Sequence, residues 1–108
     1  MQALLSASSS NPHPAIERCL RAGRAAHAEA LAQGKPEYQC EDLFHDAYLQ
    51  ALPDLSAHES ICAFIACVGY AMINGVISRE DARSYLYAAQ VALSAVPRPA
   101  TRPKTAAA

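Results

Sequence analysis

The sequence carries little charge and almost no imbalance of charge. Charged residues make up 18% of its 108 residues, and the formal net charge is −1. This balance gives no general attraction to nucleic acid, anionic membranes or acidic substrates, so binding to any of these would need a local charged patch. Hydrophobic residues make up 52%. That proportion is typical of globular proteins, and the length allows one domain.

Long apolar runs and targeting signals are also missing. No segment reaches the roughly 20 apolar residues that a membrane span requires. The first ten residues, MQALLSASSS, lack the positive region and the apolar length of a signal peptide. We therefore expect a cytoplasmic protein with no membrane partner. In a reducing compartment, the four cysteines Cys19, Cys40, Cys62 and Cys67 are most simply small, buried core residues.

The sequence shows none of the patterns that support catalysis or metal binding. It has no CxxC or HxxxH spacing, no glycine-rich phosphate loop and no recognisable nucleophile-base-acid set. His27 lies on an apolar helix face, and Glu41 and His45 lie one helical turn apart. A histidine in such a place is more often a hydrogen-bonded core residue, and one Glu-His pair has too few ligands for a metal. We expect no enzyme activity, no cofactor and no metal.

What the sequence does contain is helical periodicity in four segments. Pro14 suits the first turn of a helix, and Gly34 is a natural left-handed cap at its end. The second helix should begin near Pro36 and run to about Leu52, where Pro53 ends it.

Two capping patterns begin the second half of the domain. Ser56 with Glu59 predicts the start of the third helix, and Ser78 with Asp81 predicts the start of the fourth. Gly75 supplies the stop between them. The short connections predict an all-α, compact four-helix domain over residues 12–96, with an antiparallel pair formed by 57–74 and 79–96. Flexible tails are expected at 1–11 and 97–108.

The third helix should be central, because residues 60–73 contain no charge. A flanking stripe on this helix would let another helix approach closely, because its residues are mostly small. The stripe consists of Cys62, Ala66, Gly69 and Ile73. The main apolar stripe consists of Ile61, Phe64, Ile65, Val68, Ala71 and Met72. We therefore expect two neighbouring helices to pack against this one.

The back of the fourth helix is the leading candidate for an interaction surface. Tyr87 and Val91 lie one turn apart, flanked by Ala88 and Ala95, opposite the stripe that faces the core. Either the first or second helix covers this face, or it binds a partner or a second copy, with Tyr87 as the aromatic anchor. Binding through such an apolar face should tolerate salt.

A second candidate lies in opposite charge blocks on the first two helices. Arg18, Arg21 and Arg24 share one side of the first helix. The acidic side of the second helix carries Glu37, Glu41, Asp42 and Asp46. Such blocks are usually solvated faces with weak ion pairing. Alternatively, the arginines contact phosphates or an acidic partner, and such binding would weaken steeply with salt.

The segment NGVISREDARSYL, residues 74–86, superficially resembles a helix-turn-helix motif. Arg79 and Arg83 are offset there by Glu80 and Asp81, which are better explained as first-turn acids that favour the helix dipole. Nucleic-acid binding is therefore possible but not favoured. The tail VPRPATRPKTAAA could dock on an acidic groove or simply aid solubility, and it lacks a PxxP spacing.

Three segments carry a resemblance to a group of small, uncharacterised helical proteins from soil bacteria. They are HPAIERCLRAGRAAHAEALAQGK, LPDLSAHESICAFIACV and SYLYAAQVAL. The resemblance covers residues 13–96 and implies no activity, substrate or cofactor. It implies that this unit is a complete domain and that both tails are dispensable for the fold.

These observations predict a non-catalytic protein-interaction module with a regulatory role, which binds first to itself as a homo-oligomer. One alternative is a small DNA-associated regulator that uses residues 74–87 or the Arg18 stripe. Another is an inhibitor of a larger protein complex.

Overall fold

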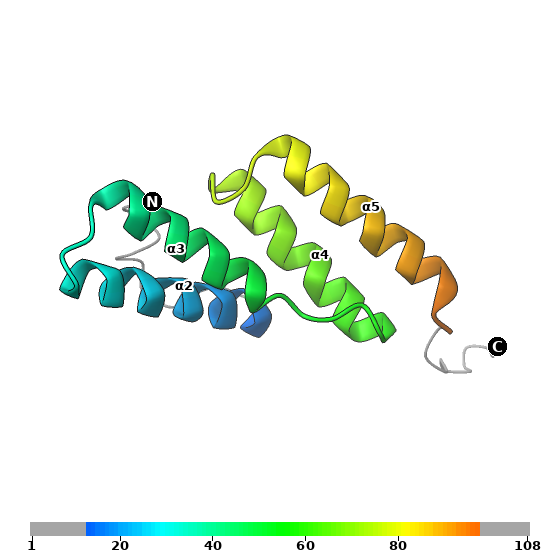
Figure 1. The fold of residues 1–108 in the computed structure, drawn as a ribbon. Coiled ribbons are helices and arrows are strands. Elements are labelled where there is room, and N and C mark those ends of the chain that lie inside the picture. Colours follow the sequence, from blue (N-terminus) through cyan, green and yellow to red (C-terminus); the bar gives the residue numbers. More distant parts are fainter. Residues whose placement is uncertain (1–12, 98–108) are drawn as a thin grey trace.

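A computed structural model describes residues 13–97, and this part of the chain contains helices and no strand. The helices are α2 (Pro14–Ala32), α3 (Glu37–Gln50), α4 (His58–Ile73) and α5 (Arg79–Ala95) (Figure 1). The predicted all-α fold with four helices and a C-terminal antiparallel pair is confirmed. The expected leader, 1–11, and all of the expected tail except Pro97 lie outside the described residues.

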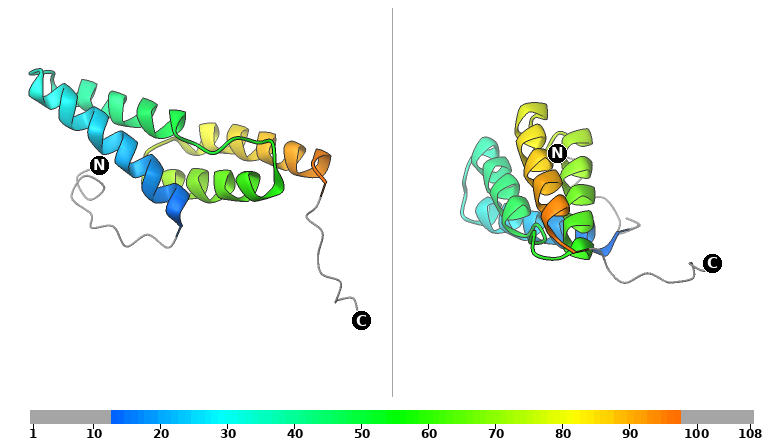
Figure 2. Two further views of the ribbon diagram at one scale, coloured as in Figure 1. Left: turned by 90° about the horizontal axis from the view of Figure 1, so that it is seen from below. Right: turned by 90° about the vertical axis from the view of Figure 1, so that its right-hand side faces the viewer.

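The helices form two antiparallel hairpins. One pairs α2 with α3, the other pairs α4 with α5, and α2 also packs against α4. Figure 1 and Figure 2 show that the two hairpins are offset along their length, so the molecule is elongated, with extents of 60 × 27 × 20 Å. No helix within residues 13–97 combines the length and apolar character needed to cross a bilayer.

Most of the helix boundaries follow the predicted local signals. Pro14 is the first residue of α2, and Pro36 immediately precedes α3. The Ser78 side chain accepts a hydrogen bond of 3.0 Å from the Asp81 N–H, which satisfies one of the donors left free at the start of α5.

The two hairpin turns depend on glycines with positive φ. Gly34 has φ of +80° and Gly75 has φ of +77°, values that side-chain-bearing residues rarely adopt. After the second glycine, the Val76 N–H donates back to the Ala71 carbonyl at 2.8 Å, and the Val76 side chain is buried. This Schellman geometry reverses the chain and turns α5 back along α4.

The start of α4 differs from the predicted capping box. The helix begins at His58 with Ala57 as the N-cap, and Asp54, rather than Glu59, makes the side-chain hydrogen bonds near this end. The Asp54 carboxylate accepts hydrogen bonds from the Ser56 N–H (3.1 Å) and hydroxyl (2.7 Å), and it lies 3.0 Å from the Ser60 hydroxyl. Ser60 Oγ also accepts the Ala57 N–H at 3.2 Å. Asp54 therefore holds the turn before the helix in place through both serines, and no described side chain caps the first N–H groups of α4.

The core lies between α2, α3 and α4, and α5 closes one side of α4. Phe64 and Tyr85 contact each other across α4 and α5 with ring centroids 6.2 Å apart. The largest fully buried side chains are Tyr48, Phe44, Leu20, Ile61 and Val68. Gly23 lets α2 approach α3 closely, because an added Cβ would lie 3.0 Å from the Phe44 ring. A side chain at position 23 would therefore require the Phe44 ring to shift.

Two glycines inside helices should respond oppositely to replacement by alanine. Gly69→Ala should raise the unfolding free energy by up to about 1 kcal/mol, because the new Cβ meets no atom within 4 Å and alanine favours helix. Gly23→Ala should lower it by about 1 to 3 kcal/mol, because Phe44 must move. Urea unfolding of both variants measures the difference. Equal changes in the unfolding free energy of the two variants would contradict the close approach of α2 and α3 at Gly23.

Asp54 should make the stability of the protein depend on acid. Hydrogen bonds from the Ser56 side chain, the Ser56 N–H and Ser60 hold the pKa of Asp54 below its ordinary value of 3.8. This stabilisation is fully present above the unfolded-state pKa and is lost as the pH falls through the lower folded-state pKa. The melting temperature of the wild type should therefore exceed that of Asp54→Asn at pH 7. The difference between the two melting temperatures should disappear as the pH falls below 3.8. A difference in melting temperature that does not change with pH would contradict the stabilising role of the Asp54 carboxylate.

Candidate functional site

The outward face of α5 is not covered by any other described helix. Tyr87 is 68% exposed and Val91 is 49% exposed. The helix buries only Ala82 and Ala89, both against α4. All four residues predicted for this face, Tyr87, Ala88, Val91 and Ala95, are solvent-exposed. The alternative in which α2 or α3 covers the face is wrong, since all four of its residues are exposed.

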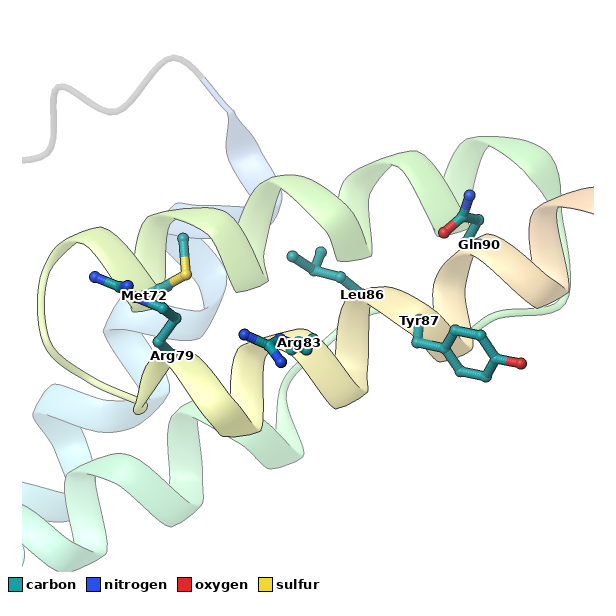
Figure 3. Close-up of a pocket in the computed structure, with 6 residues that line it drawn as sticks. All are labelled: Met72, Arg79, Arg83, Leu86, Tyr87 and Gln90. Carbon is teal, nitrogen blue, oxygen red and sulfur yellow. The ribbon is translucent and has the colours of Figure 1, made fainter.

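A groove runs beside this face, between α5 and the end of α4. It encloses about 410 Å³. The lining residues are Met72, Arg79, Arg83, Leu86, Tyr87 and Gln90 (Figure 3). Figure 3 shows Leu86 directed toward α4, with Arg79, Arg83 and Tyr87 following one another along α5. Met72 and Leu86 extend the apolar surface next to Tyr87.

Helix α4 is less enclosed than its composition predicts. Its main stripe packs against α2 and α5, but the flanking stripe is only partly enclosed: Ala66 packs against the core, whereas Cys62 and Ile73 are exposed. Ile73 is 80% exposed, and the space around Gly69 is open. Cys62 is also exposed, which corrects the expectation that all four cysteines are buried. Its Sγ lies 3.9 Å from His58 Nδ1.

The arginines of α2 do not form one matching surface with the acids of α3. Arg18 and Arg21 are exposed, whereas Arg24 is half-buried and approaches Glu17 of its own helix at 3.5 Å. In the described part of the chain, neither Arg18 nor Arg21 forms an ion pair with α3. The predicted charge stripe therefore separates into two solvated arginines and one that packs along α2.

The histidines lie apart from one another. His27 is buried, as expected for a core residue, but the expected hydrogen bond is missing at its Nε2, which lies 3.7 Å from a carboxylate oxygen of Glu37. His45 Nδ1 lies 3.4 Å from Asp46 rather than contacting Glu41. Among residues 13–97, no three His, Cys, Asp or Glu side chains gather closely enough to hold a metal ion. The described side chains offer no constellation from which a reaction could be derived.

A buried polar junction, not anticipated from the sequence, joins the two hairpins. The thiols of Cys19 on α2 and Cys67 on α4 are hydrogen-bonded to each other and fully buried. This bond lowers the pKa of Cys19, and together with burial it raises the pKa of Cys67. Tyr48 on α3 donates its hydroxyl to the Cys67 carbonyl at 2.7 Å. Burial raises the pKa of Tyr48, so its hydroxyl stays a neutral donor.

Comparisons with known proteins found no matching family model, no similar curated protein and no similar solved structure. The resemblance to the uncharacterised helical group therefore stays a prediction.

Tyr48→Phe should lower the unfolding free energy by about 1 kcal/mol, because a buried hydrogen bond between α3 and α4 is lost. Tyr70→Phe is the matched control. Its hydroxyl makes no hydrogen bond within the described residues, so little change is expected. Urea unfolding monitored by circular dichroism compares the two variants. Equal effects would show that the Tyr48 hydroxyl does not hold the hairpins together.

Proposed function

We propose that this chain is a non-catalytic, cytoplasmic protein-interaction module that associates with itself through the outward face of α5. The observation that carries the proposal is the exposure of Tyr87 and Val91, one turn apart, on a helix that no other helix covers. An aromatic ring combines a large apolar area with few rotatable bonds, so it is an effective interface anchor.

The surroundings of Tyr87 support the same function. The groove places Met72 and Leu86 next to Tyr87, so apolar surface continues from α5 toward α4. Ala88 and Ala95 leave room for a partner to approach the helix closely. A surface of this kind gains stability when a second apolar surface displaces water from it.

The DNA-binding alternative draws little support from the arrangement of α4 and α5. Helix-turn-helix motifs cross at roughly 90 to 120°. Here the two helices lie side by side and antiparallel (Figure 1). Arg79 and Arg83 also share the first two turns of α5 with Glu80 and Asp81. Inhibition of a larger complex is a second alternative, and it would use the same apolar surface on another protein.

Tyr87→Glu should convert an associated protein into a folded monomer. A charged side chain at the centre of the contact would be desolvated without a partner, which should weaken association by at least about tenfold. Because Tyr87 is exposed in the single chain, the unfolding free energy should change by less than about 0.5 kcal/mol. Light scattering over a dilution series measures the mass, and urea unfolding checks the fold.

Ala28→Glu, which adds the same charge at an exposed position of α2, is the control and should leave the mass unchanged. A wild-type protein that stays monomeric at every concentration would overturn the proposed self-association. The DNA-binding alternative would be favoured if the protein shifted the electrophoretic mobility of random duplex DNA at low salt and lost this effect on replacement of Arg79 and Arg83.

A further inference from the structure

Helix α5 presents a row of two positive charges and one aromatic ring. Arg79, Arg83 and Tyr87 follow at intervals of four residues, and all three side chains are exposed (Figure 3). Neither arginine forms an ion pair within the described residues. All three residues line the groove, so a partner bound there would contact both the arginines and the tyrosine ring.

Helix α3 presents the same pattern with the opposite charge. Tyr38, Asp42 and Asp46 also follow at intervals of four residues, and all three are exposed. The Tyr38 ring is 64% exposed, and the side chain of Asp46 is 63% exposed. His45 Nδ1 lies 3.4 Å from a carboxylate oxygen of Asp46. No lysine or arginine of the described chain pairs with either aspartate.

The two rows match in one direction only. Successive members are about 6 Å apart along each helix, because an α-helix rises 1.5 Å per residue. If α3 is laid antiparallel on α5, Asp46 meets Arg79, Asp42 meets Arg83, and the two tyrosines meet. A parallel alignment in the same register keeps one ion pair and sets an arginine against a tyrosine. Shifted by one turn, the parallel alignment keeps both ion pairs but leaves both tyrosines without a counterpart. The antiparallel alignment therefore satisfies every member of both rows.

The match cannot be formed within one molecule as folded. Helices α3 and α5 belong to different hairpins, do not pack against each other and form none of these pairs. Resting on the self-association proposed above, we infer that the occupant of the α5 surface is α3 of a second copy, docked antiparallel. The charged pairs and the tyrosines together set its direction, and the tyrosines, beside Met72 and Leu86, also supply the apolar contact.

The contact joins two unlike surfaces, which determines how copies assemble. If two copies exchange the contact around a two-fold axis, a closed dimer results. If they do not, each copy leaves one free α3 and one free α5, and the assembly extends. Both arrangements require a complementary charge on the other copy, so one set of variants tests the contact itself.

Charge reversal provides the test. Arg79→Glu with Arg83→Glu should weaken self-association by about tenfold or more, and so should Asp42→Arg with Asp46→Arg, because two exposed pairs are replaced by repulsion. Mixing these two proteins should restore association, and so should one chain carrying all four changes. Arg18→Glu with Arg21→Glu on α2 is the control. It makes the same change in net charge as the reversal of Arg79 and Arg83, and it should have little effect on self-association. Sedimentation or light scattering at fixed salt measures each case.

The outcomes separate this inference from the proposed function. If Tyr87→Glu abolishes association but neither charge reversal exceeds the α2 control, the α5 surface stands and the docking of α3 is overturned. Failure of the mixture and of the four-change chain to associate would also overturn it, provided that urea unfolding shows both to be folded. A wild-type protein that is monomeric throughout overturns both.

Discussion

The contact between α2 and α4 holds the whole structure together, because it is the main packing between two otherwise separate hairpins. Its centre is buried and partly polar. Tyr48 reaches from α3 to the Cys67 carbonyl of α4, and the Cys67 thiol meets Cys19 of α2. The Tyr48 hydroxyl connects α3 with α4, and the Cys67 thiol continues the connection to α2. Buried donors without partners are costly, so this hydrogen bond favours one relative placement of the hairpins over others.

The exposed surfaces follow from that placement. Helix α4 uses one side for the junction with α2 and another for α5, and the offset of the hairpins leaves none of the described helices to cover the rest (Figure 2). Ile73 and the open side of Gly69 therefore face solvent although the helix carries no charge beyond Glu59. In the same way, α5 packs chiefly against α4, and Tyr87 on its other side is exposed. An apolar helix becomes an interaction surface when its neighbours are too few to enclose it.

The distribution of charge is consistent with the same geometry. The basic row on α5 and the acidic row on α3 lie on different hairpins, whose offset keeps them apart in one chain. Exposed ion pairs contribute little to the stability of a fold, so their separation has a small cost within the monomer. Between copies the same charges can select a direction of docking, where specificity matters more than strength. The α2 arginines have no such counterpart row.

Local signals in the sequence were sufficient for the helices and their ends. Pro14, Gly34, Gly75 and Ser78 act on backbone groups within a few residues of themselves, so their effects can be predicted without knowing the fold. The exception at the start of α4 is also local. There Asp54 forms hydrogen bonds with Ser56 and Ser60, in place of the predicted capping box of Ser56 and Glu59.

The sequence by itself therefore determined that the chain forms four helices, where they turn, and that Tyr87 and Val91 lie opposite the core stripe of their helix. Only the tertiary structure decided that no helix covers those residues, that Cys62 is exposed while Cys67 is buried, and that α3 and α5 stay apart. The reason is that periodicity assigns each residue to a face of its own helix. Which faces are buried depends on contacts between distant segments, and those are set by how the two hairpins meet.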